Sequence, residues 1–270
     1  MYRRFQIKDI DIVVSEFTKN GQVGVLDEVR RRGRELDEDF ASKVKDSVSA
    51  ISASADGAID GDVLEAAWFP QLAFDVFISH SHVDRSMALM MSGALKKFFG
   101  LNAFVDSVVW NCRDRLIKKL RELSGNNSCY PCPDPETENA IVSHADIMLG
   151  NSLMRMIDRC ECLMFLNTAH SISREDILEK TYSAWLYSEL VMSKFVRIRK
   201  PERYKNCRVL NEGFKSAMDS FSLKISHNAD TRHLGVITPE MFIEWIVTAK
   251  IKCLRGSPAL DSLYEIVGEY

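Results

Sequence analysis

Apolar residues recur at helical spacing over residues 25–51, with charged residues between them. The apolar positions of this segment are Leu26, Val29, Leu36, Phe40, Val44, Val48 and Ile51. This period predicts an amphipathic helix. Because Gly33 and Lys43 interrupt the period, a sustained coiled coil is not expected. We expect the helix to pack on its own domain or on a twin subunit.

Small and polar residues follow this helix. Residues 52–57 and 60–62 consist of Ser, Ala, Asp and Gly, a composition typical of a linker. A short helix is predicted from about Val63 to Phe69, and it should end there because Pro70 disfavours helical geometry at the residue before it. We therefore divide the chain into a helical N-terminal extension with its linker, residues 1–70, and a second domain, residues 71–270.

Short apolar runs alternate with helical periods in the second domain. The predicted strands are residues 74–79, 103–106, 162–166 and 221–225. The predicted helices are residues 87–98, which Gly100 should end, residues 141–158, residues 183–196, and a last helix that begins at Thr238, Pro239 and Glu240. This alternation predicts an α/β fold, in which helices cover both faces of a parallel sheet.

Residues 111–143 do not follow either pattern clearly. They contain Gly125, Asn126 and Asn127, and prolines at positions 131, 133 and 135. We expect a long loop here, and long loops in compact domains are usually functional or mobile.

The composition is that of an ordinary globular protein, since 46% of the 270 residues are hydrophobic and 27% are charged. The 35 Lys and Arg against 38 Asp and Glu give a net charge of −3, so there is no basic excess to attract nucleic acid. No apolar run approaches the roughly 18 residues of a membrane-spanning helix, and the charged N-terminal segment leads into no signal-peptide core. We expect a soluble cytoplasmic protein that binds neither nucleic acid nor membrane.

The cysteines and histidines do not form a convincing metal site. The seven cysteines are an odd number, which does not suggest a disulfide framework. Cys129 and Cys132 form a C-x-x-C motif without a second pair or a His cluster. His80 and His82 flank a serine, again without an evident third ligand. We expect reduced structural thiols and no metal.

Polar residues follow several of the predicted strands. In an open parallel sheet, ligands bind beyond the carboxyl ends of the strands. That rule selects residues 79–82, residues 106–110 and the residues from Asn167 onward. The helix over residues 183–196 starts at the same edge, and its Trp185 and Glu189 are four residues apart on one face. An indole beside a carboxylate can hold a planar ring and the sugar next to it, although such a pair is more commonly a core Trp and an exposed Glu.

Three motifs follow one another along the second domain. They are F-D-V-F-I-S-H-S-H-V-D over residues 74–84, A-F-V-D-S over residues 103–107 and S-A-W-L-Y-S-E-L over residues 183–190. In this order they resemble the Toll/interleukin receptor (TIR) domain family, above all its bacterial branch, and the resemblance covers about residues 73–250. Two features depart from the family pattern, namely the long segment 124–136 and the charged residues 174–180.

The resemblance implies a flavodoxin-like fold and, for enzymatic members, cleavage of NAD+ between nicotinamide and ribose. It implies that Glu189 is catalytic and that Trp185 shapes the nicotinamide–ribose pocket. The other residues that it places at the NAD+ cleft or on the mobile loop that gates it are Ser79, His80, Asp106 and Trp110. NAD+ is then the substrate, and no metal or other cofactor is implied.

Departure of nicotinamide leaves an oxocarbenium-like ribose, which a nearby carboxylate stabilises. Water as the acceptor gives ADP-ribose, and an acceptor within the same molecule gives a cyclic product. The resemblance further implies signalling in antiphage defence, a homo-oligomer formed through TIR–TIR contacts, and a sensor or effector protein as partner. Residues 1–70 would serve oligomerisation or docking.

Two alternatives remain open. A non-catalytic TIR adaptor would act through TIR–TIR contacts alone, and a nucleoside deoxyribosyltransferase-like enzyme shares the sheet type and a glutamate. The pair of Trp185 and Glu189 favours catalysis over the adaptor, because an adaptor does not need that acid.

Overall fold

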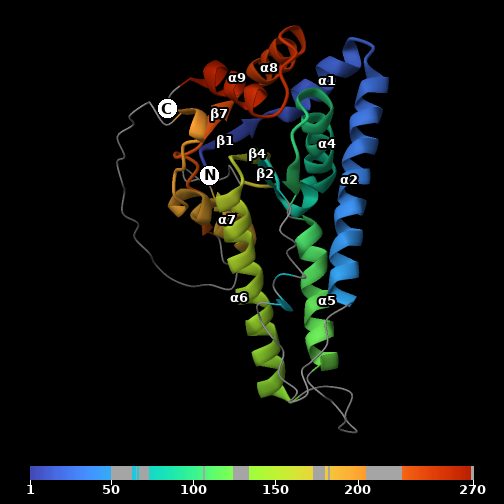
Figure 1. Cartoon of the computed structure of the whole chain (residues 1–270), viewed down its shortest axis with the longest axis vertical. Helices are drawn as coiled ribbons and strands as arrows, with labels where there is room; N and C mark the ends of the chain where they lie inside the picture. The colour runs from blue at the N-terminus through green and yellow to red at the C-terminus, as the bar shows by residue number, and fades with distance from the viewer. Residues whose placement is uncertain are drawn as a thin grey trace.

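A parallel five-stranded sheet forms the centre of the molecule (Figure 1). The computed structural model describes residues 1–49, 63–64, 66, 73–105, 107–123, 134–172, 180–181, 183–204 and 227–268. The strands stand in the order β3-β2-β4-β1-β7. Their bounds are β1 Arg3–Lys8, β2 Val76–Ser79, β3 Ala103–Val105, β4 Cys162–Asn167 and β7 Gly235–Ile237. Every residue of β2 and β4 is buried, as expected for strands that are covered on both faces.

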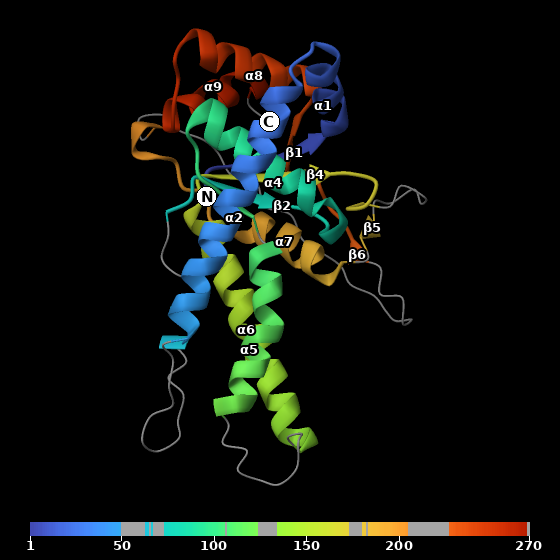
Figure 2. The ribbon, with the colours of Figure 1, turned by 90° about the vertical axis from the view of Figure 1, so that its right-hand side faces the viewer.

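Helices cover both faces of this sheet (Figures 1 and 2). On one face, a core cluster joins the sheet to α1 (Ile10–Lys19), α4 (Arg85–Ala94), α8 (Pro239–Ile251) and α9 (Ser257–Val267). On the other face, a second cluster joins it to α5 (Ser107–Leu123), α6 (Pro135–Arg159) and α7 (Ala184–Phe195). The predicted α/β fold, a parallel sheet flanked by helices, is therefore confirmed, and it is consistent with a flavodoxin-like fold.

Short elements complete the described chain. They are η1 (His82–Asp84), the π-helical turn η2 (Leu95–Phe99), η3 (Glu202–Tyr204), and the two-stranded antiparallel pair of β5 (Lys180–Thr181) and β6 (His227–Asn228). Gly100 follows η2 with a left-handed φ of 70°, so it ends this helical stretch as predicted.

The first residues of the chain form part of the sheet. Strand β1 lies between β4 and β7 and pairs parallel with both. The expectation of a purely helical extension over residues 1–70 is therefore wrong for these residues. The sequence of β1 does not look like that of a central strand. Arg4 and Gln6 alternate with Phe5 and Ile7, so the strand contains no continuous apolar run.

The strand order has one further consequence for the predicted topology. A flavodoxin-like sheet has the order 2-1-3-4-5. If β2 is taken as the first strand, β3, β2, β4 and β7 occupy the positions of strands 2, 1, 3 and 5, and β1 fills the remaining position.

The strand predicted over residues 221–225 lies outside the described residues, as does the predicted linker over residues 52–62. Of the predicted helix 63–69, residues 63, 64 and 66 are described and are helical.

The long helix α2 (Val23–Ser49) packs tightly along α4. Gly33, which interrupts the apolar period of α2, lies at the point where the two helices touch. A Cβ atom on Gly33 would lie 1.9 Å from the carbonyl oxygen of Leu89, and one on Gly93 would lie 1.9 Å from that of Val29. Because only glycine permits such an approach, these two residues let the helix backbones meet. Helix α2 of the predicted extension thus packs on α4 of the second domain.

Helices α5 and α6 replace much of the long loop expected over residues 111–143. They pack side by side and run away from the sheet (Figures 1 and 2). Pro135 is the first residue of α6, and the Asp134 carboxylate accepts hydrogen bonds from the backbone N–H groups of Glu136 and Thr137, both at 3.0 Å. The proline and the acid therefore start a helix here. Residues 124–133 lie outside the described residues.

Candidate active site at the carboxyl ends of the sheet

The candidate site lies where the strand order changes direction. From β2 the chain crosses to β3 on one side, whereas β4 is the neighbour of β2 on the other side. In sheets of this kind the crevice beyond the carboxyl ends of two such strands is the usual ligand site. Here these ends are Ser79 of β2 and Asn167 of β4.

Ser79 contacts Glu189, the acid on α7. The Ser79 hydroxyl donates a hydrogen bond of 2.6 Å to Oε2 of Glu189, and each residue is only 1% exposed. Glu189 reaches this position because α7 starts at Ser183, whose hydroxyl accepts a bond from the N–H of Leu186. The structure thus brings together two predicted site residues that are far apart in the sequence, and it buries the acid.

Trp185 lies one helical turn before Glu189. Its side chain is partly buried and packs against the apolar cluster beneath α5, α6 and α7. The indole therefore contributes to the core at the edge of the site, and the shared helix face agrees with the spacing of the two residues.

A second acid, Asp84, ends the short helix η1 that follows β2. Asp84 accepts a hydrogen bond of 2.6 Å from the Ser81 hydroxyl and one of 2.5 Å from the Thr168 hydroxyl. These bonds join the loop after β2 to the loop after β4, so the two loops form one polar edge. Asp84 belongs to the first TIR-like motif, but its bond to Thr168 joins residues 84 positions apart and could not be predicted from that motif.

His80, another predicted site residue, is buried beside helix α2. It lies close enough to Asp37 of α2 to affect the pKa of that acid, which also forms an ion pair with Arg85 at the start of α4. Burial raises the pKa of Asp37, while Arg85 and His80 oppose that rise. Helix α2 is therefore linked electrostatically to the loop that carries the predicted site residues.

The N-terminal strand adds polar side chains to the sheet face under α7. The amide Nδ2 of Asn167 donates to Oε1 of Gln6 at 2.8 Å. The Arg4 guanidinium donates to the carbonyl oxygen of Val196 at 2.6 Å, where α7 ends. The negative end of the helix dipole stabilises a cation at the carboxyl end of α7. Arg4 and Gln6 were not predicted as site residues, because residues 1–70 were assigned to a separate extension.

The segment before β7 also holds α7 in place. The Ser193 hydroxyl lies 2.8 Å from Nε2 of His233, and Lys194 forms an ion pair of 2.9 Å with Asp230. Burial lowers the pKa of His233 to about 4, so the ring is neutral at ordinary pH. Bonds to Arg232 and Lys194 hold the pKa of Asp230 below its usual value, although burial opposes them.

The remaining predicted residues have different outcomes. Asp106 lies outside the described residues, and Trp110 lies in α5 at a position whose side chain is not described. Cys129 and Cys132 also lie outside them. Burial raises the pKa of the Cys160 thiol to about 12 and that of Cys162 well above its usual value. Within the described ranges, no group of three or more His, Cys, Asp or Glu side chains is placed to hold a metal ion.

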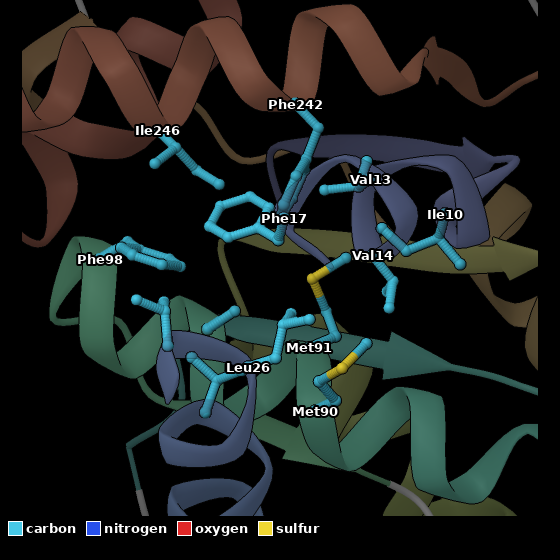
Figure 3. Close-up of a pocket in the computed structure, with 13 residues that line it drawn as sticks. Ile10, Val13, Val14, Phe17, Leu26, Met90, Met91, Phe98, Phe242 and Ile246 are labelled. Carbon is cyan, nitrogen blue, oxygen red and sulfur yellow. The ribbon is translucent and has the colours of Figure 1, made fainter. Parts of the chain in front are cut away.

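Among the described residues, two of the cavities lie away from this site. One of about 40 Å³ is almost wholly apolar and lies between α1, α2, α4 and α8, where Phe17, Met91 and Ile246 are among its lining residues (Figure 3). The other, of about 240 Å³, lies between α2, α4 and β3 and is lined in part by Asp37 and Phe40. Neither is lined by Glu189.

Comparisons with known proteins add no assignment. No protein-family model, no curated protein and no solved structure matches this chain. Among the described helices, none is both long and apolar enough to cross a membrane.

Proposed function

We propose that this protein is a TIR-type NAD+ nucleosidase that cleaves the bond between nicotinamide and ribose. The observation that carries the proposal is the buried pair of Ser79 and Glu189 at the carboxyl ends of the parallel strands. An acid on a helix surface needs no such partner. A carboxylate that is held by a serine at the usual ligand crevice of an α/β sheet is instead typical of a functional site.

The chemistry matches this arrangement. Nicotinamide in NAD+ carries a positive charge and leaves readily, so positive charge develops on the ribose. The Glu189 carboxylate stabilises that charge and orients the ribose hydroxyls, and Ser79 fixes the carboxylate by its hydrogen bond. The products are nicotinamide and ADP-ribose when water is the acceptor, or a cyclic ADP-ribose when the acceptor is internal.

Burial of Glu189 adds a condition to the proposal. At 1% exposure Glu189 is covered, so the site must open before a substrate makes contact with it. We assign this movement to assembly of several copies through TIR–TIR contacts, with a sensor or effector protein as partner. In this proposal the enzyme acts in the cytoplasm, in bacterial antiphage defence.

The test is release of nicotinamide by the purified full-length protein at high concentration. We expect nicotinamide on a chromatogram of the NAD+ reaction, and Glu189→Gln should abolish it while circular dichroism shows an unchanged fold. Glu244→Gln is the matched control, because Glu244 is exposed on α8, which covers the opposite face of the sheet. Wild-type turnover in the Glu189→Gln variant would refute the role of this acid. Self-association without any nicotinamide release would instead identify a non-catalytic adaptor.

A further inference from the structure

Two amide side chains lie next to each other close to the candidate active site. Asn167 is the last residue of β4, and Gln6 lies on the neighbouring strand β1. They are 4% and 5% exposed, and the Asn167 amide donates its hydrogen bond to Gln6 at 2.8 Å. Buried amides at the end of a parallel sheet are uncommon, because such strands are usually apolar throughout.

These amides share one face of the sheet with Ser79. Phe165 of β4 is in register with Ser79 on β2 and with Gln6 on β1. Neighbours of these residues along the strands, such as Ile7 and Leu166, belong to the core cluster on the opposite face. The pair of Asn167 and Gln6 and the pair of Ser79 and Glu189 therefore lie on the α7 side, separated in the sheet by Phe165.

The hydrogen bond to Gln6 fixes the orientation of the Asn167 amide. Because Oε1 of Gln6 accepts from Nδ2 of Asn167, the carbonyl oxygen Oδ1 of Asn167 is the atom that remains available. This oxygen is buried and has no hydrogen-bond partner among the described residues. A buried acceptor without a donor is unfavourable, so a ligand that supplies an N–H group there gains binding free energy.

From this geometry we infer that Asn167 is the residue that recognises the carboxamide of nicotinamide and that Gln6 positions it. The inference rests on the proposed NAD+ cleavage. The carboxamide NH₂ group donates to Oδ1 of Asn167, which places the pyridine ring at the sheet edge and the adjoining ribose towards Glu189. Gln6 acts through Asn167 and does not touch the substrate. The N-terminal strand thereby supplies part of the specificity of the site.

The test compares two dinucleotides that differ only at the carboxamide. NAD+ carries the NH₂ donor, whereas 3-acetylpyridine adenine dinucleotide carries a methyl ketone that cannot donate. The measurement is the ratio of kcat/KM for the two substrates, with the purified full-length protein at high concentration. In Asn167→Leu, which is similar in size, we expect this ratio to fall about tenfold from its wild-type value, as expected for one lost hydrogen bond.

Three further variants make the outcome decisive. Gln6→Met should lower the same ratio because it frees the Asn167 amide to rotate, and it also serves if Asn167→Leu does not fold. Asn151→Leu is the matched control on an exposed position of α6 and should keep the wild-type ratio. Glu189→Gln should abolish turnover of both dinucleotides.

The outcomes separate the two proposals. A wild-type ratio in both Asn167→Leu and Gln6→Met, with activity still dependent on Glu189, would overturn the role of the amide pair and leave NAD+ cleavage intact. Absence of nicotinamide release from NAD+ by the wild-type protein would overturn both. A lower ratio in the folded variants supports the inference, because a merely structural role changes stability without changing the preference for the carboxamide.

Discussion

The contact between α2 and α4 makes a sharp prediction about stability. In Gly33→Ala, the new Cβ would lie 1.9 Å from the carbonyl oxygen of Leu89 and 2.6 Å from its carbonyl carbon. Ordinary contacts between carbon and carbonyl oxygen are about 3.3–3.6 Å, so the helices must separate by more than about 1 Å. Around this crossing, a gap of about 1 Å removes about half of the dispersion energy of each separated contact.

The expected loss follows from these distances. Overpacked sites usually lose about 1–3 kcal/mol, and here the obstacle is backbone, which yields less than a side chain does. We expect Gly33→Ala to lower the free energy of unfolding by about 3 kcal/mol, although alanine favours helices by about 1 kcal/mol over glycine. Gly150→Ala in α6 should gain up to about 1 kcal/mol, because nothing lies within 4 Å of its Cβ position.

The assay is urea unfolding followed by circular dichroism at the helix band. Gly24→Ala provides a second control within α2 itself, again with no atom within 4 Å of the added carbon. Gly93→Ala acts at the same crossing, so the double variant with Gly33→Ala should lose less than the sum of the two single losses. If Gly33→Ala proves as stable as Gly24→Ala, α2 does not pack on α4 as described.

Three other predictions follow from the polar contacts and the buried thiols. In the folded protein His233 has a pKa of about 4, against an ordinary value of 6.5, so as the pH falls the unfolded chain binds a proton before the folded protein does. The free energy of unfolding should therefore fall by on the order of 2 kcal/mol as the pH drops from 6.5 to 4. His233→Gln should flatten that fall, the exposed His144→Gln should not, and identical pH profiles would contradict the assigned cause. Arg4→Gln should lower the free energy of unfolding by about 1–2 kcal/mol, since it removes a charged bond to the end of α7, whereas unchanged thermal and urea unfolding would exclude that bond. Peptide mapping after maleimide treatment of the native protein should find Cys253 labelled and Cys160 and Cys162 unlabelled, and early labelling of the latter two would show that they are not buried.

Local sequence rules predicted the elements that depend on local chemistry. Strands β2 and β4 stood out because both faces are buried and their sequences are continuous apolar runs. Helix α8 starts as predicted, with the Thr238 hydroxyl accepting a bond from the N–H of Met241 and Pro239 in the first turn. Ser79 and Glu189 could be placed at one edge because parallel strands end at the same side of a sheet.

Contacts between distant segments could not be predicted in this way. Strand β1 has charged and polar residues on one face, so its apolar content is too low to indicate a central strand. The hydrogen bond between Gln6 and Asn167 depends on the position of β1 in the sheet, so it could not be predicted either. Gly33 appeared to weaken a helix, and only the opposing helix shows why a glycine belongs there. Pro135 is typical of a loop, and only the cap formed by Asp134 explains why it begins α6 instead.

The place of β1 has a consequence for how the chain folds. Phe5 pairs with Met164 on one side and with Gly235 on the other, so this strand is synthesised long before either neighbour. Until both neighbours are made, Phe5 and Ile7 have no completed sheet to cover them. Closing so large a loop is entropically unfavourable, and sheets that depend on such remote pairings fold slowly. The insertion of β1 is therefore expected to be the late, rate-limiting step of folding, and the nascent chain is expected to need protection from aggregation until the sheet is complete.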